Sequence, residues 1–179
     1  MKIATVATAI LLAVPAAAQA QVGGWDPAEV DKARATSTAF LEASPSMERF
    51  FKEAYAYAVY PTIAKAAFIV GGAHGSGIAF RNGSAIGKTS LTQASVGLQW
   101  GGQAYSEIIF FQNEASFERF ASNNLELAAQ VSAVVVTAGA SADVAYEGGV
   151  AVFTMAKGGA MLEASVGGQK LKFEPREEG

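Results

Sequence analysis

The sequence has no cysteine and a single histidine, and this scarcity narrows the chemistry that the chain can perform. Without cysteine, the chain cannot form disulfides, thiolate metal sites, a cysteine nucleophile or a lipid anchor on cysteine. The lone histidine is His74, and no acidic residue lies within five positions of it to complete a metal or catalytic set. Redox chemistry through thiols is therefore excluded, and we expect no metal and no cofactor.

Charge is scarce as well. Charged residues make up 16% of the chain, and the formal net charge is −3. This balance gives no general attraction to nucleic acid or anionic membranes, so an anionic partner must meet a local site. The chain has 179 residues, of which 51% are hydrophobic, so we expect one domain with a buried core and no intrinsic disorder.

The first twenty residues have the layout of a secretory leader. One lysine precedes an apolar run from Ile3 to Val14, and Pro15 and small residues ending in Ala18-Gln19-Ala20 follow it. This pattern predicts a signal peptide, residues 1–20, that is cleaved after Ala20. The run is too short for a membrane span, which needs about 20 apolar residues. We therefore expect an exported, periplasmic or secreted protein.

Residues 21–60 are expected to form an N-terminal helical segment. Asp26-Pro27-Ala28-Glu29 provides an N-cap acid and a proline at the first helical position, which predicts a helix from Pro27. Ser44-Pro45 interrupts it, and a second helix follows with one apolar side: Met47, Phe50, Phe51, Ala54, Tyr55 and Ala58. That side faces a core or a bilayer, and the mixed charges on the opposite side favour the core. Tyr60-Pro61 is expected to end this helix.

Residues 61–173 change to short β-prone runs that are separated by glycine. Glycine pairs predict turns between antiparallel strands at 71–72, 101–102, 148–149, 158–159 and 167–168. We expect strands over 64–70, 76–81, 93–100, 105–111 and 129–139, with a turn at Asn82-Gly83. Residues 150–156, 160–166 and 169–173 predict a three-stranded meander. Residues 174–179 are expected to be a polar tail.

One helix is predicted between these strands. It begins at Asn113-Glu114, carries Phe117 and Phe120 at helical spacing, and ends at Asn123-Asn124. The expected fold class is α+β, in which an antiparallel, partly closed sheet or barrel of seven or eight strands is covered by N-terminal helices and one inserted helix.

The glycine-rich segment around His74 has two interpretations. Glycines let backbone amides approach an anion, so residues 71–77 could form a phosphate-binding loop. Neither nucleotide motif fits, however, because Gly87-Lys88-Thr89 lacks the first glycine of a P-loop and a strand-like run follows Gly77. A structural glycine hairpin is the favoured interpretation.

Several segments between Tyr60 and Phe173, about two-thirds of the chain, resemble one known family. The strand Ile63–Val70 contains a lysine and is followed by Gly71-Gly72 and by Gly75-Ser76-Gly77. Further segments are 97–103 (GLQWGGQ), 108–111 (IIFF), 124–127 (NLEL) with Ala138-Gly139, and Ala142 with Glu147. In this order and spacing they resemble the SYLF family of lipid-binding domains, also called the yeast actin-binding type.

The resemblance implies a non-catalytic domain that binds phospholipids, phosphoinositides included, or a membrane surface. For an exported bacterial member, this points to a role at the cell envelope. Members that bundle actin carry a Src-homology-3 or zinc-finger module, which this chain does not show, so actin binding is doubtful. Nucleic acid is not expected as a partner, and protein partners stay open.

Three classes of function remain. In the first, strand residues accept acyl chains while basic residues meet a phosphate head group; the candidate lipid-binding residues are Lys65, Phe68, Val70, His74, Ile78, Phe80, Arg81 and Lys88. The second class is a structural or protein-interaction module of the envelope, without a specific lipid. The third is a hydrolase built on Ser76 or Ser90 with His74, which has no orienting acid nearby in the sequence.

Overall fold

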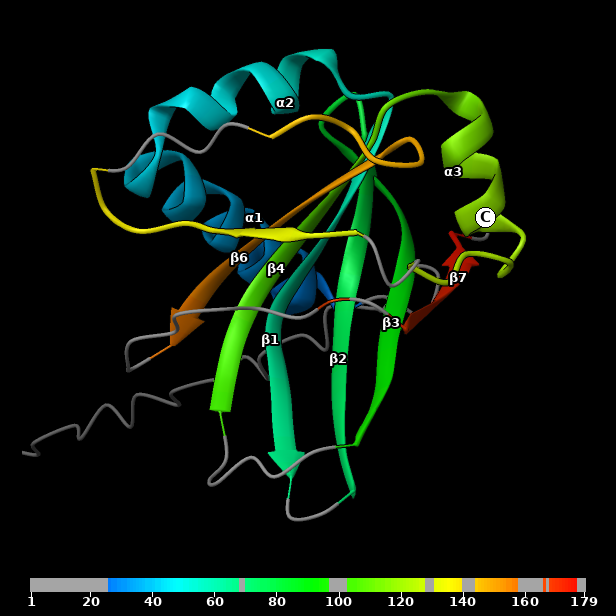
Figure 1. Cartoon of the computed structure of the whole chain (residues 1–179). Coiled ribbons are helices and arrows are strands. Elements are labelled where there is room, and N and C mark those ends of the chain that lie inside the picture. Colours follow the sequence, from blue (N-terminus) through cyan, green and yellow to red (C-terminus); the bar gives the residue numbers. More distant parts are fainter. Residues whose placement is uncertain are drawn as a thin grey trace, which may run out of the picture.

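Figure 1 shows a computed structural model of the chain, which describes residues 26–67, 70–96, 103–127, 131–139, 144–157, 166 and 168–176. The elements follow one another in this order: α1 (Pro27–Ala43), the 3-10 helix η1 (Pro45–Met47), α2 (Glu48–Glu53), β1 (Ala56–Ala67), β2 (Val70–Arg81), β3 (Ser84–Val96), β4 (Gln103–Phe111), α3 (Glu114–Ala121), β5 (Ala133–Val135), β6 (Val150–Lys157) and β7 (Gln169–Pro175). None of these helices combines the length and the apolar character that crossing a membrane requires.

The strands form one sheet in the order β5-β6-β4-β1-β2-β3-β7. Neighbouring strands are antiparallel except for β5 and β6, which run parallel. The predicted α+β class, with N-terminal helices and one inserted helix, is confirmed. Within the described residues the sheet is not closed, because β5 and β7 are edge strands that do not pair with each other.

The sheet curls around one face, which we call the inner face. On this face, the ring of Phe120 in α3 lies 4.7 Å from Phe111 of β4 and 5.2 Å from Phe173 of β7. One helix therefore packs on two strands that are separated by β1, β2 and β3 in the sheet order. A right-handed twist that accumulates from strand to strand produces this curl.

The opposite, outer face of the sheet is covered at one end by α1, η1 and α2 (Figure 1). Helix α1 begins as predicted, with Asp26 as N-cap and Pro27 at the first helical position. Met47 and Phe50 are buried, and the Phe50 ring lies 4.8 Å from that of Phe153 in the outer-face core. The apolar side of this segment thus faces the core, as the mixed charges of its other side indicated.

The helix predicted to continue to Ala58 is wrong beyond Glu53, because β1 begins at Ala56. Alanine is compatible with both structures, and pairing with β2 and β4 decides the outcome here. Pro61, expected to end the helix, lies inside β1 instead. The predicted helical segment 21–60 is therefore shorter than expected.

Pro61 is tolerated in this strand because it lies in a β-bulge. Val59 pairs with Ile78 and Thr62 with Ser76, so Tyr60 and Pro61 stand opposite Gly77 alone. A proline at a bulge removes no ladder hydrogen bond. A Cβ at position 77 would lie 2.2 Å from the carbonyl oxygen of Val59, so the close approach of β1 to β2 requires glycine there.

Two predictions about the glycine pairs are wrong. Gly71-Gly72 is no turn but lies within β2, paired with both β1 and β3. The meander predicted over 150–173 does not form, because β6 lies between β4 and β5 while β7 pairs with β3 at the other edge. Packing of Phe173 on α3 and pairing with β3 place β7, and neither contact is encoded in the local glycine pattern.

Two other predicted turns are confirmed, and several further predictions concern residues outside the described part of the chain. Asn82-Gly83 is a tight turn in which both residues have positive φ, and Gly148 and Gly149 also adopt positive φ before β6. Of the strand predicted over 129–139, the structure shows only β5 (Ala133–Val135), and residues 129–130 lie outside the described residues. The pairs at 101–102 and 158–159, Gly167 and residues 160–165 lie outside the described residues, whereas β7 extends to Pro175, into the predicted polar tail.

Candidate functional site

A pocket of about 540 Å³ opens on the outer face of the sheet beside the first turn of α1. Five elements contribute to its lining, namely α1, β1, β2, β3 and β7. Its cationic groups are Lys32, Lys88 and Lys172, and its acidic groups are Glu29 and Glu174. The pocket is therefore lined mostly by polar and charged residues, with a small excess of positive charge, at the boundary between the helix-covered and uncovered parts of the sheet.

The strand register explains why these side chains meet. Ile78 pairs with Lys88, and Ser76 pairs with Ser90, so all four side chains project from the same face of the sheet. Ser90 in turn pairs with Lys172 of β7. Because directly opposed residues on antiparallel strands share a face, three neighbouring strands bring two hydroxyl groups and two ammonium groups to one side.

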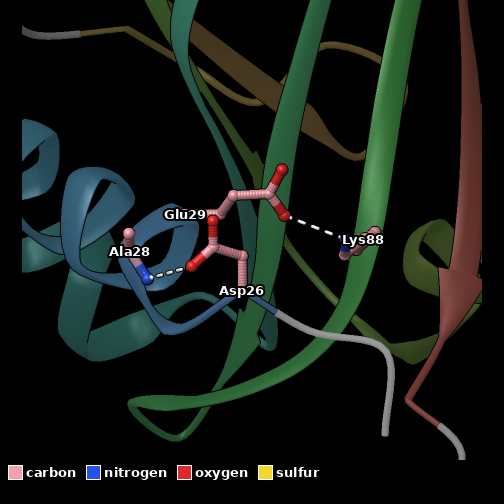
Figure 2. A network of polar contacts seen from close by, with 4 residues as sticks. All are labelled: Asp26, Ala28, Glu29 and Lys88. Atoms are coloured by element: carbon pink, nitrogen blue, oxygen red, sulfur yellow. Dashed lines mark hydrogen bonds and ion pairs between the residues drawn. The ribbon is translucent and has the colours of Figure 1, made fainter. Parts of the chain in front are cut away.

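The first turn of α1 closes one side of the pocket, and Figure 2 shows its contacts. Asp26 caps the helix by accepting a hydrogen bond at Oδ1 from the backbone N–H of Ala28, at 2.9 Å. Glu29, in the same first turn, places Oε2 2.9 Å from Nζ of Lys88. The ion pair therefore joins the helix to β3 across the pocket.

Further lysines extend the positive charge over the outer face. Lys157 of β6 donates from Nζ to Oγ1 of Thr62 at 2.9 Å, beside the pocket. Partial burial and, to a smaller extent, the nearby Lys32 lower the pKa of Lys157. Lys170 pairs with Thr92 on β3 and shares this face as well. Lysines thus concentrate on one face of a chain whose net charge is −3.

The candidate residues from the sequence separate into several groups. His74, Ile78 and Lys88 line the pocket, and His74 is exposed. Phe80 is buried in the outer-face core, where Arg34 of α1 lies over its ring. The buried parts of Ile78 and Phe80 lie under α1, so in this structure they do not form an open cleft for acyl chains.

The remaining candidates lie elsewhere. Arg81 is exposed, and its guanidinium lies 4.1 Å from the centroid of the Tyr55 ring. Lys65 pairs with Ala73, whose side chain is in the inner-face core, so Lys65 projects from the face opposite to the pocket. Val70 lies in β2, although its side chain and the whole of Phe68 are outside the described residues.

Sequence reasoning missed Lys32, Lys172, Lys157 and Glu29 as parts of this site. The alternation in Gln169–Phe173 places Lys170 and Lys172 on one face of a strand, and that signal was available. The contributions of Glu29 and Lys32 depend on how α1 docks on the sheet, which no local pattern encodes.

For the hydrolase interpretation, the structure brings the three residues into one pocket but shows no catalytic contact between them. Ser76, Ser90 and His74 do line the same pocket. In the part of the chain that the structure describes, however, the His74 side chain forms no hydrogen bond, and no three His, Asp or Glu side chains gather as a metal site. Besides the carboxylates of Glu29 and Glu174, three ammonium groups and the serine hydroxyls converge here, and such donors suit recognition of an anion.

Fold and site together define an α+β protein with a curled, open sheet and a basic pocket on its outer face. Residues 92–178 match the Ysc84 family, described as "Las17-binding protein actin regulator". The chain is also similar to Beta cell expansion factor A of Aeromonas veronii, with 30% identity over 129 residues. That alignment covers 70% of this chain and 48% of the relative, so the chain spans about half the length of the curated relative.

The chain contains a domain of the Ysc84/SYLF family, and the resemblance found in the sequence is confirmed. The match to the family begins within β3 and includes β4, α3 and β5 to β7. Of the pocket residues, it contains Lys172 and Glu174, while those supplied by α1, β1, β2 and β3 precede it.

Proposed function

We propose that this chain is a non-catalytic domain that binds the phosphate head groups of anionic phospholipids and acts, after export, at the bacterial cell envelope. The observation that carries the proposal is the convergence of Lys32, Lys88 and Lys172 with the hydroxyl groups of Ser76 and Ser90 in one pocket. The chain as a whole is acidic, so the local excess of ammonium groups provides an attraction that the net charge does not.

The chemistry of the pocket matches a phosphate group. Ammonium groups act as point charges for phosphate oxygens, and serine hydroxyls donate hydrogen bonds to the oxygens that remain. Charge-assisted hydrogen bonds of this kind are about twice as strong as those between neutral groups. Pro61 and Ile78 are the apolar contributors to the lining, so the pocket suits a polar head group better than an acyl chain.

Membership of the Ysc84/SYLF family supports the same conclusion, because the resemblance implies a phospholipid-binding domain. The family description also names actin regulation, but the proposal concerns lipid, since the pocket is built for a small anion. Export is proposed from the leader-like residues 1–20.

Co-sedimentation with vesicles tests the proposal. We expect binding to vesicles of equal parts phosphatidylcholine and phosphatidylglycerol, and little binding to phosphatidylcholine alone. Binding should weaken as salt shortens the Debye length from about 10 Å at 0.1 M to about 3 Å at 1 M. The double variant Lys88→Gln, Lys172→Gln should bind weakly, whereas Lys52→Gln on α2, outside the pocket, should bind like the wild type. Equal binding by all three proteins would reject the pocket as the lipid site, and absence of binding to either vesicle would favour an envelope-interaction module.

A further inference from the structure

We propose that Glu29 is a built-in competitor for the pocket, whose carboxylate neutralises Lys88 until an anionic head group displaces it. The inference rests on the proposed function and concerns how the same site is regulated. It assigns α1 a second role, because the helix that covers the sheet also supplies the group that a ligand has to replace.

The geometry places Glu29 where a phosphate oxygen would bind. Its Oε2 lies 2.9 Å from Nζ of Lys88 (Figure 2), and both residues line the pocket that Lys32 and Lys172 share. A carboxylate at this position resembles the ligand in charge and in hydrogen-bonding character. The pocket therefore contains an internal anion that uses one of its three ammonium groups.

The helix does not need this carboxylate in order to begin. The backbone N–H of Glu29 donates to the carbonyl oxygen of Asp26 at 3.0 Å, and the Asp26 carboxylate accepts from Ala28. These bonds satisfy the start of α1 through main-chain groups and the N-cap. The Glu29 side chain can therefore rotate towards solvent while α1 keeps its first turn.

Breaking the ion pair between Glu29 and Lys88 also costs little free energy. The Glu29 side chain is 48% exposed and that of Lys88 is 34% exposed, so water already screens the pair. Exposed ion pairs contribute little because solvent screening and side-chain entropy offset their attraction. A phosphate bound to Lys88 would also lie near Lys32 and Lys172, and these two ammonium groups offset both the lost ion pair and the repulsion from Glu174, which pairs with Lys88 in the sheet.

The experiment compares charge removal at two positions on α1. Glu29→Gln should increase affinity for vesicles of equal parts phosphatidylcholine and phosphatidylglycerol by about two- to five-fold at low salt, the range expected for an exposed ion pair. Asp31→Asn is the matched control, because Asp31 is exposed on the same helix and lies outside the pocket lining. A second arm replaces the vesicles with soluble glycerol phosphate, which separates recognition of a lipid surface from recognition of phosphate alone. Circular dichroism verifies that both variants keep their helices.

A double variant decides whether the effect acts through Lys88. In a Lys88→Gln background, Glu29→Gln should no longer increase affinity, because the group for which it competes has been removed. The competitor role is overturned if Glu29→Gln binds like the wild type, or if Asp31→Asn raises affinity as much as Glu29→Gln does. Either result would leave the proposed function intact. If the wild type binds neither vesicles nor glycerol phosphate, the proposed function itself fails.

Discussion

Gln169 donates a hydrogen bond from Nε2 to Oε2 of Glu107 at 3.1 Å, although β7 and β4 are separated by three strands in the sheet order. The contact is possible because the sheet curls around its inner face. Both side chains are fully buried, and the other carboxylate oxygen of Glu107 has no hydrogen-bond partner among the residues that the structure describes. Burial raises the pKa of Glu107 to about 8, while the hydrogen bond from Gln169 acts in the opposite direction.

This buried carboxyl group makes stability depend on pH. The pKa of Glu107 is about 8 in the folded chain against an ordinary value of 4.5, so between these limits the folded state holds a proton that the unfolded chain has released. The contribution is therefore fully present below about pH 4.5 and decreases as pH rises towards 8, by at most about 1.4 kcal/mol per pH unit. Glu107→Gln should remove this decrease, because the amide keeps the acceptor for Gln169 without a proton to lose.

Urea unfolding of the two proteins across this pH range measures the effect. Glu118→Gln on the exposed side of α3 is the control for loss of one negative charge. Parallel pH profiles for the wild type and Glu107→Gln would show that Glu107 does not titrate in this window.

A second prediction concerns the bulge of β1. Gly77→Ala would place a Cβ 2.2 Å from the carbonyl oxygen of Val59 and 2.9 Å from Cδ1 of Tyr60. Relief of this clash requires backbone movement, and we expect a loss of about 1–3 kcal/mol in the free energy of unfolding. Gly72→Ala in the same strand is the matched control, since its nearest contact would be 3.3 Å and the loss should be smaller. Equal losses in the two variants would contradict the role assigned to Gly77.

The elements that could be predicted from sequence are those with local signals. Asp26-Pro27 marks the start of α1, Asn113 caps α3 and Asn82-Gly83 turns β2 into β3, because each position depends on backbone groups close by in the chain. The strand predicted over 64–70 captures only the end of β1, and residues 56–61 were missed because they are largely buried on both faces and show no alternation. The position of β7 was missed because it depends on contacts with β3 and α3.

The candidate site shows the same division. The sequence identifies Lys88 as a candidate, but not its position in a shared pocket. Glu29 and Lys172 are distant from it in the chain and come close to it only after folding. Lys65 was predicted as a lipid-binding residue because it interrupts an apolar run. The register places it on the inner side of the sheet, away from the pocket, a distinction that requires knowledge of which residues pair.

A third prediction concerns the leader. Ala18 and Ala20 are the small residues that a signal peptidase accepts, so the mature protein recovered from periplasmic extract should begin at Gln21. N-terminal sequencing of the purified protein measures this directly. Retention of Met1 on a membrane-bound species would contradict both cleavage and the soluble periplasmic location.

The most direct test of the central claim is an NMR titration with glycerophosphoglycerol, the head group of phosphatidylglycerol without its acyl chains. We predict that amide shifts change around the pocket, at Ser76, Lys88, Ser90 and Lys172, and that lengthening acyl chains on the same head group hardly alters affinity. Lys65→Met should bind like the wild type, because Lys65 lies on the other face of the sheet. Affinity that rises by about 0.8 kcal/mol per added methylene, or shift changes confined to the surroundings of Lys65, would contradict head-group recognition in this pocket.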